Sequence, residues 1–138
     1  LDSIQAIVLR EKLLLLDEWN KKRREVACEY RKGLCGLPLD LIKENSLNES
    51  VHHLFVVMTK RRKELQESLS RAGIPTGIHY PVPIHKHKAF GSEAFANGHS
   101  EFPVSEMASE RLLSLPIHPH MLKSEISKVV DHIIKFFG

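Results

Sequence analysis

Histidines are the residues whose number and spacing most directly suggest chemistry. Nine of the 138 residues are histidine, and four of them form two pairs with one residue between, His85 with His87 and His118 with His120. On an extended segment, side chains two residues apart point to the same side, so each pair could chelate zinc or nickel. No cysteine or carboxylate stands at ligand spacing beside either pair. We therefore expect these histidines to lie at the surface or to face a substrate, and we expect no metal site.

The tripeptide His79-Tyr80-Pro81 is a second candidate for chemistry. The pattern predicts that it ends a strand, and a rigid proline turn would fix the two side chains before it. His79 and Tyr80 together offer hydrogen bonds and an apolar ring face, which suits a sugar or a base. The structural alternative is that His79 satisfies a buried backbone group and that Tyr80 packs in the core. The residues alone leave both interpretations open.

Other common chemistries find little support in the residue pattern. The basic clusters at 21–24 and 60–63 have no aromatic residues interleaved with them, and the first alternates with glutamates as on a solvated helix face, so we expect no nucleic acid partner. The serines lie in no nucleophile-elbow pattern, and Cys28 has no base near it in sequence. The segment 73–77 lacks the lysine and the hydroxyl of a phosphate-binding loop.

Composition describes one ordinary domain. The hydrophobic share is 42%, and 20 basic residues against 17 acidic residues leave a net charge of +3, too small to indicate binding to nucleic acid or to an acidic membrane. The longest apolar run, Leu13 to Leu16, is far shorter than the roughly 18 residues that cross a bilayer. Cys28 and Cys35 form no disulfide pattern, so we expect reduced thiols and a cytoplasmic protein.

The elements that must position these residues follow from the apolar periodicity. Apolar residues at helical spacing predict a helix from about residue 2 to residue 32, ended by Gly33 and Gly36. This length exceeds the usual globular helix, so we expect either a break near 17–20 or a helix that runs along a larger body. The segment 37–50 has many turn formers and predicts a surface connection.

Short strands and helices alternate beyond residue 50. We expect a strand over 53–58, a helix over 60–72 capped by Thr59 and stopped by Gly73, and a second strand over 74–80. A loop should follow over 81–101, and then a helix over 102–113 with Glu106 toward solvent. The chain should end with an extended segment over 115–119 and a last helix opened by Ser124 and Glu125. In sum, the pattern predicts an α+β fold in which helices cover one side of a small sheet.

The order and spacing of several motifs resemble one known family. The motifs are Leu-Asp-Ser-Ile-Gln-Ala over 1–6, Trp19-Asn20, Arg23 or Arg24 with Tyr30, His53, Gly73-Ile74, Gly-Ile-His-Tyr-Pro-Val-Pro over 77–83, Phe102-Pro103, Glu106 and Leu-Ser-Leu-Pro-Ile-His-Pro over 113–119. Together they resemble the C-terminal domain of the DegT/DnrJ/EryC1/StrS sugar aminotransferases, across essentially all 138 residues.

The resemblance implies the small domain of the aspartate aminotransferase fold (fold type I), a mainly antiparallel sheet covered by helices. It also implies a pyridoxal phosphate enzyme, a homodimer that moves an amino group, commonly from glutamate, onto a nucleotide-linked keto sugar for a cell-surface polysaccharide or an antibiotic. The Schiff-base lysine of such enzymes belongs to the large domain, so we expect no catalytic and no cofactor-binding residue in this chain. Near the active-site mouth, the resemblance implies substrate contacts from His79, Tyr80, Pro81 and His85, and substrate differences within 86–100. It implies a structural role for His118.

The chain starts at Leu1 without methionine, so we expect a piece of a longer protein. Residues 1–138 would form one C-terminal domain, with a connecting helix over 1–34 and an αβ core over 51–138. Such a piece would be inactive alone and would self-associate through exposed apolar helix surface. Three alternatives stay open: a free-standing protein-binding or regulatory module, part of a related sugar dehydratase that lacks the lysine, and a metal-binding module that uses the histidine pairs.

Overall fold

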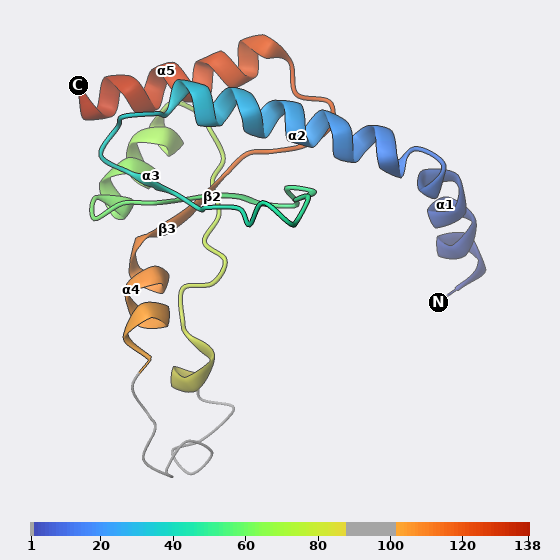
Figure 1. Ribbon diagram of the computed structural model, residues 1–138, viewed down its shortest axis with the longest axis horizontal. Helices are drawn as coiled ribbons and strands as arrows, with labels where there is room; N and C mark the ends of the chain where they lie inside the picture. Colours follow the sequence, from blue (N-terminus) through green and yellow to red (C-terminus); the bar gives the residue numbers. More distant parts are fainter. Residues whose placement is uncertain (1, 88–101) are drawn as a thin grey trace.

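The computed structural model describes residues 2–87 and 102–138 (Figure 1). Its elements follow in the order α1 (Ser3–Leu13), α2 (Leu16–Gly33), β1 (Asp40–Leu41), β2 (Phe55–Met58), α3 (Arg62–Arg71), the 3-10 helix η1 (Ile84–Lys86), α4 (Pro103–Arg111), β3 (Leu112–Leu115) and α5 (Lys123–Phe137). Helices beside a small antiparallel sheet make the fold α+β, as the sequence predicts.

The sheet is built around β2. Its strand order is β1-β2-β3, and both pairings are antiparallel, with Asp40 opposite Met58 and Phe55 opposite Leu115. Along β2, Phe55 and Val57 are buried, whereas Val56 and Met58 are half-buried. This alternation directs one face of the sheet toward the core, as expected for a strand with period 2.

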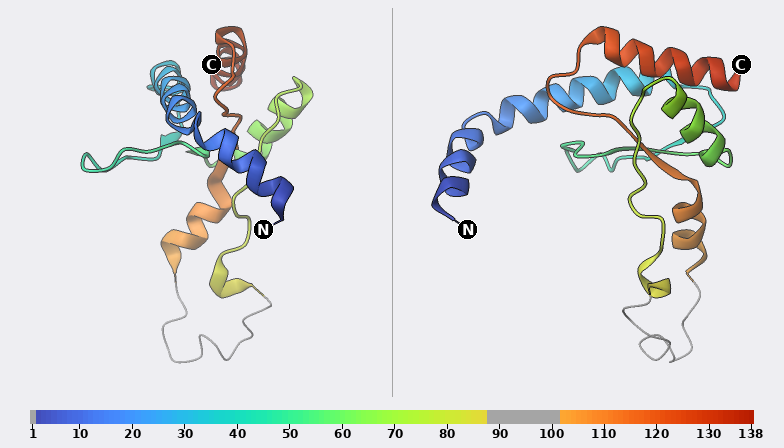
Figure 2. Two further views of the ribbon diagram at one scale, coloured as in Figure 1. Left: turned by 90° about the vertical axis from the view of Figure 1, so that its right-hand side faces the viewer. Right: turned by 180° about the vertical axis from the view of Figure 1, so that it is seen from behind.

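Helices α2, α3 and α5 cover that face of the sheet (Figures 1 and 2). Residues spaced three and four apart on α5 are buried, namely Ile126, Val129 and Ile133. The core also includes Val26, Ala27, Tyr30, Leu34, Phe55, Val57, Leu65, Leu69, Ile74, Leu113 and Leu115. The predicted stripe on the last helix is therefore confirmed in its main positions, although Ile134 is exposed.

Thr59 and Gly73, the residues that the sequence predicts at the two ends of this helix, both lie just outside α3. The Thr59 hydroxyl accepts a hydrogen bond from the Arg61 N–H at 3.2 Å, which satisfies a backbone donor just before the helix. After the helix, Gly73 has φ of +68°, a left-handed conformation that glycine adopts without a steric penalty. The prediction for Gly73 is confirmed. The predicted cap by Thr59 is wrong, because the helix begins at Arg62 after the N-cap residue Arg61 and has no side-chain cap.

The long N-terminal helix is broken, a few residues earlier than expected. α1 ends at Leu13 and α2 begins at Leu16. α2 packs on α5, whereas α1 turns away from the body and has no buried residue (Figure 1). No glycine or proline stands at the break, so no local signal marked it.

Three further differences concern the sheet. The strand expected over 74–80 is reduced to a single bridge between Gly77 and Ser114, because Pro75 and Pro81 each lack the N–H that a ladder needs. Conversely, the expected surface connection at 37–50 contains β1, which pairs with β2. The helix expected to reach residue 113 ends at Arg111, and Leu112 enters β3.

A narrow extension leaves the sheet on the side away from α2 and α5. It consists of α4 and the segment 78–87, which run side by side (Figures 1 and 2). Pro103 occupies the first turn of α4, as predicted. The rest of the expected loop, 88–101, lies outside the described residues. Among the described helices, none is both long and apolar enough to cross a membrane.

Candidate functional site

His79 stands where the extension leaves the sheet. Gly77 exchanges both backbone hydrogen bonds with Ser114 of β3, at N···O distances of 3.1 and 2.8 Å. Two residues further, the Nδ1 atom of His79 lies 3.0 Å from the Oγ atom of Ser114. His79 is itself exposed, so its ring bridges a buried strand residue and the surface.

Tyr80 and Pro81 line a groove between the segment 80–87 and α4. The side chain of Tyr80 is 74% exposed, and its ring meets the His79 ring edge-to-face at a centroid distance of 5.7 Å. The groove has a volume of about 660 Å³ and is mostly apolar. Its lining residues are Tyr80, Pro81, Val82, Pro83, Ile84, His87, Ser105, Ala108, Ser109 and Leu112.

The positions of His79 and Tyr80 argue against a purely structural role for His79-Tyr80-Pro81. Tyr80 does not pack in the core, and the described hydrogen bond of His79 goes to the side chain of Ser114 and not to a buried backbone group. Exposed rings above an apolar groove are the arrangement that a planar or sugar-like ligand would use.

His85 lies at the far end of the same segment, on η1. Its Nε2 atom is 2.9 Å from Oε1 of Glu106, and the Nζ atom of Lys86 is 2.7 Å from Oε2 of the same carboxylate. The hydrogen bonds from Lys86 and His85 lower the pKa of Glu106 below its ordinary value. Glu106 thus ties η1 to α4, while 33% of its side chain remains exposed to solvent, as expected.

The predicted site residues are only partly brought together. Tyr80 and Pro81 share the groove with His87, while His79 faces Ser114 and His85 faces Glu106. Sequence reasoning missed Ser114 and Glu106 as partners, although both stand in motifs quoted above. A polar residue within an apolar strand motif, as in Leu-Ser-Leu, was the signal available for Ser114.

The histidine pairs do not assemble a metal cluster among the described residues, where no group of three or more His, Cys, Asp or Glu side chains could hold an ion. In the second pair, the Nδ1 atom of His118 accepts a hydrogen bond from the His120 N–H at 3.2 Å. This local bond uses a ring nitrogen of His118 to fix the turn before α5, which agrees with the structural role implied for it.

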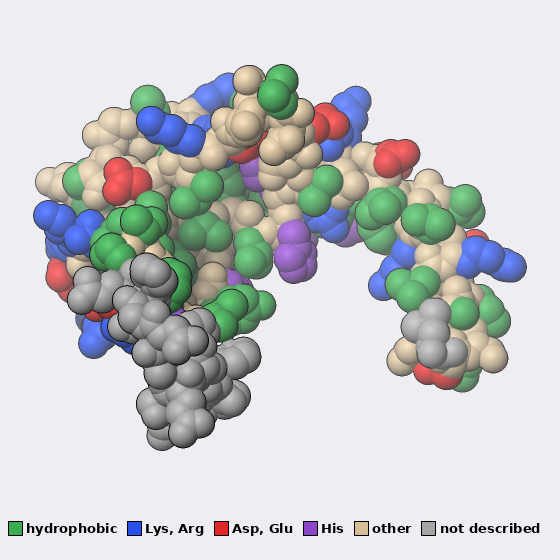
Figure 3. Space-filling view, turned by 60° about the horizontal axis from the view of Figure 1, so that its bottom comes forward, with side chains coloured by type: hydrophobic (Ala, Val, Ile, Leu, Met, Phe, Trp, Pro, Cys, Tyr) green, Lys and Arg blue, Asp and Glu red, His purple; other side chains and the backbone are tan. Residues whose placement is uncertain are grey.

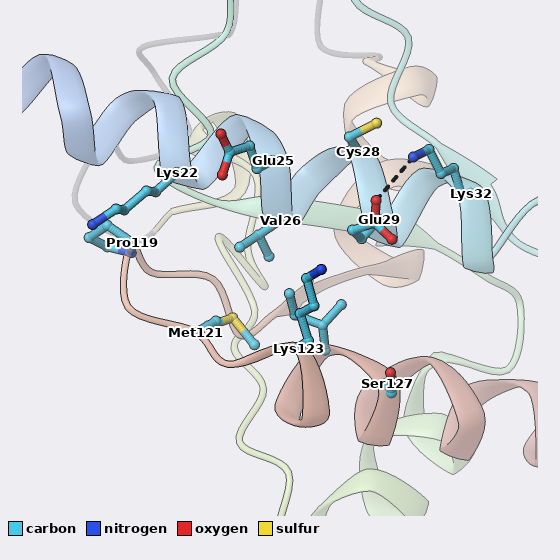
Figure 4. A pocket seen from close by; sticks show the side chains of 11 residues that line it. Lys22, Glu25, Val26, Cys28, Glu29, Lys32, Pro119, Met121, Lys123 and Ser127 are labelled. Atoms are coloured by element: carbon cyan, nitrogen blue, oxygen red, sulfur yellow. Dashed lines mark hydrogen bonds and ion pairs between the residues drawn. The ribbon is translucent and has the colours of Figure 1, made fainter.

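A second groove, of about 690 Å³, lies between α2 and α5 (Figure 4). Lys22, Lys32 and Lys123 line it together with the free thiol of Cys28. Lys32 donates to Glu29 at 3.0 Å, and this bond raises the pKa of the lysine. Lys22 pairs with Glu18 outside the groove, at 2.7 Å.

Comparison with known proteins covers nearly the whole chain. Residues 1–134 match the DegT/DnrJ/EryC1/StrS aminotransferase family. The chain is 42% identical over 134 residues to the dTDP-3-amino-3,4,6-trideoxy-alpha-D-glucose transaminase of Streptomyces venezuelae, covering 96% of this chain and 35% of that protein. It is 35% identical over 123 residues to the UDP-2-acetamido-2-deoxy-3-oxo-D-glucuronate aminotransferase of Pseudomonas aeruginosa, covering 88% and 32%.

The fold agrees with the sequence comparison. The crystal structure of S. venezuelae DesV in complex with a ketimine intermediate superposes with a TM-score of 0.91 at 42% identity, covering 99% of this chain and 36% of that one. The chain therefore spans about a third of the length of the relatives it matches.

Proposed function

Because the chain belongs to the DegT/DnrJ/EryC1/StrS aminotransferase family, we propose that it is the C-terminal part of a cytoplasmic, pyridoxal phosphate-dependent aminotransferase. The proposed substrate is a nucleotide-linked keto sugar, and the proposed amino donor is glutamate. The observation that carries the proposal is similarity along 96% of the chain to a nucleotide-sugar transaminase. Relatives that act on dTDP-linked and UDP-linked sugars support the substrate class and leave the nucleotide open.

The segment 79–85 is the proposed substrate rim. Tyr80 and Pro81 supply apolar surface beside the groove, and the His79 ring stands exposed next to them. Stacking of a sugar or base on Tyr80 and a hydrogen bond from His79 would orient the nucleotide sugar. His85 would complete the rim from η1, where Glu106 holds its ring.

The lysines that the structure describes do not suit pyridoxal phosphate. The cofactor supplies an electron sink when a lysine amine binds it, and that amine must lose its proton. The Lys32 ammonium is instead stabilised by Glu29, and no described lysine of the chain is buried. We therefore propose that the cofactor and its lysine belong to a large domain outside these residues, that the full-length protein is a homodimer, and that the chain alone is inactive.

A cofactor-binding experiment tests whether the chain by itself binds pyridoxal phosphate. The purified 138-residue chain is mixed with pyridoxal phosphate, treated with borohydride and analysed by peptide mass spectrometry. We expect no absorbance band of a lysine-bound cofactor and no single modified lysine. Trapping at one site would contradict the proposal. Weak, scattered modification of exposed lysines is the background to subtract.

A kinetic experiment on the full-length protein tests the rim. Tyr80→Ala should raise KM for the nucleotide sugar by about tenfold, because a stacked aromatic ring contributes about 1 to 3 kcal/mol. Leu47→Ala is a matched control, since Leu47 is 90% exposed and lies outside the groove. If Tyr80→Ala leaves KM unchanged, the rim assignment is wrong. Release of a dehydrated sugar without amino transfer would instead identify a dehydratase.

A further inference from the structure

Ser114 is a buried serine whose hydroxyl group contacts the ring of His79, an exposed residue of the proposed substrate rim. It lies in β3 between Leu113 and Leu115, and only 4% of its surface is exposed. Its Oγ atom is 3.0 Å from Nδ1 of His79, although 35 residues separate the two in the sequence. No other described hydrogen bond involves this hydroxyl group.

The surroundings of the hydroxyl group decide which atom carries the proton. A buried hydroxyl hydrogen needs an acceptor, and Nδ1 of His79 is the acceptor described for it. If Nδ1 carried a proton instead, it would donate to Oγ, and the hydroxyl hydrogen would be left without a described acceptor. The arrangement therefore favours donation from Ser114 to Nδ1, which places the ring proton of neutral His79 on Nε2.

The absence of a side chain at Gly77 leaves room for the ring of His79. A Cβ atom built on Gly77 would lie 2.6 Å from Cε1 of His79, closer than non-bonded carbon atoms approach. The backbone of Gly77 is itself fixed by the bridge to Ser114. Ser114 and Gly77, which both contact the ring, thus belong to one backbone-bonded junction at the edge of the sheet.

We propose that Ser114, with Gly77, is a positioning residue that holds His79 as the Nε2–H tautomer, so that Nε2–H donates to an oxygen of the nucleotide sugar. The substrate part of this inference rests on the proposed function. Fixing a ring before the ligand arrives reduces the conformational entropy lost on binding. The chemistry of the acceptor is broad: a sugar hydroxyl, a carbonyl or a phosphate oxygen would each accept this hydrogen bond.

Nuclear magnetic resonance of the 138-residue chain tests the positioning without any sugar or cofactor. Long-range proton-nitrogen spectra of the histidine rings should show Nδ1 of His79 without a proton, and one set of ring signals with contacts from Hε1 to Gly77. In Ser114→Ala these contacts should disappear as the ring samples several orientations, and Ser114→Thr should retain them because it keeps the hydroxyl. A protonated Nδ1 in the unaltered chain would overturn the proposal.

A second serine-histidine pair provides the matched control. Ser68 of α3 lies 3.0 Å from Nε2 of His132 on α5, outside the rim. Ser68→Ala should change the signals of His132 and leave those of His79 as they are. If Ser114→Ala does not fold, Gly77→Ala displaces the same ring while keeping the hydroxyl, and it should also remove the single ring orientation.

Kinetics of the full-length protein test the role toward the sugar. Ser114→Ala should raise KM for the nucleotide sugar by about three- to tenfold with kcat nearly unchanged, the effect of one lost hydrogen bond in binding. Ser68→Ala should change neither. If Ser114→Ala leaves KM unchanged while His79→Ala raises it, the positioning role is wrong and the proposed function stands. If His79→Ala also leaves KM unchanged, the substrate contact itself is wrong.

Discussion

Tyr30 is the residue at which a single polar atom interrupts the apolar core. Its side chain is fully buried against Phe55, with ring centroids 5.0 Å apart. The hydroxyl donates to the carbonyl oxygen of Pro116 at 2.8 Å, a contact between α2 and the segment after β3. The helical stripe of the sequence predicts the burial of Tyr30, but only the fold shows what its hydroxyl group binds.

Tyr30→Phe should lower the free energy of unfolding by about 1 to 2 kcal/mol, because the Pro116 carbonyl loses its donor in a partly buried position. Urea denaturation followed by circular dichroism measures this. A decrease below a few tenths of a kcal/mol would contradict it.

The same residue predicts a pH dependence at the alkaline end. Burial, with a smaller contribution from Glu125, raises the pKa of Tyr30 in the folded chain. The folded state therefore holds this proton more tightly than the unfolded state, whose tyrosine pKa is about 10. Its contribution to stability is constant below about pH 10 and is lost as the pH rises further. Tyr30→Phe should flatten the fall in stability above pH 10.

At the scale of elements, the contact between α2 and α5 depends on Gly33. A Cβ atom there would lie 2.6 Å from Cγ1 of Val130, so the helices approach too closely for a side chain. The sequence marks Gly33 only as a helix end. Its second role, allowing close packing of a helix 97 residues further along the chain, becomes visible only in the fold.

Gly33→Ala should therefore destabilise the chain by about 1 to 3 kcal/mol through overpacking, even though alanine favours helix more than glycine does. Gly33→Ala combined with Val130→Ala should recover part of the loss. Thermal and urea denaturation of both single variants and the double variant measure the coupling. Strictly additive effects would show that the two side chains do not meet.

The junction between η1 and α4 depends on Glu106. Hydrogen bonds from Lys86 and His85 lower the pKa of this carboxyl group, so its contribution to holding η1 is present above the ordinary carboxyl pKa of 4.5. This contribution is lost as the pH falls through the lowered value. At neutral pH, Glu106→Gln should loosen η1 without unfolding the chain.

Hydrogen exchange of the amides of Lys86 and His87 measures the loosening of η1. Both amides donate within this turn, to Pro83 and Ile84. Their protection should be lower in Glu106→Gln at pH 7, and the difference from the unaltered chain should vanish as the pH falls through the lowered pKa of Glu106. Glu110→Gln is the control, because Glu110 lies on the same helix and is exposed. Equal protection in both variants at pH 7 would contradict the role of Glu106.

At the scale of the whole molecule, α1 is a helix whose large apolar side chains are exposed. Ile4 is 77% exposed, Ile7 is 57% exposed and Leu13 is 66% exposed. Figure 3 shows hydrophobic side chains along this arm, apart from the main body. An apolar surface of this kind promotes association in water.

The chain should therefore self-associate as its concentration rises, in sedimentation velocity runs. Ile4→Glu with Ile7→Glu should weaken this association and change the free energy of unfolding by less than about 0.5 kcal/mol, because neither side chain is in the core. Gln5→Glu adds a charge to the same helix and serves as the control. A monomer at all concentrations would contradict the expectation.

The sequence alone determined the α+β class, the family, a strand over 53–58 that the structure shortens to 55–58, the helix stopped by Gly73 and the buried stripe of α5. These features follow from residue periodicity, turn chemistry and motif order, which are local properties of the chain. Only the tertiary structure decided that β1 pairs with β2, that Gly77 forms one bridge and not a strand, and that the N-terminal helix breaks before Leu16. Likewise, it alone joined Ser114 to His79 and Glu106 to His85. Single polar contacts between distant residues leave no periodic mark, because they depend on how the elements pack.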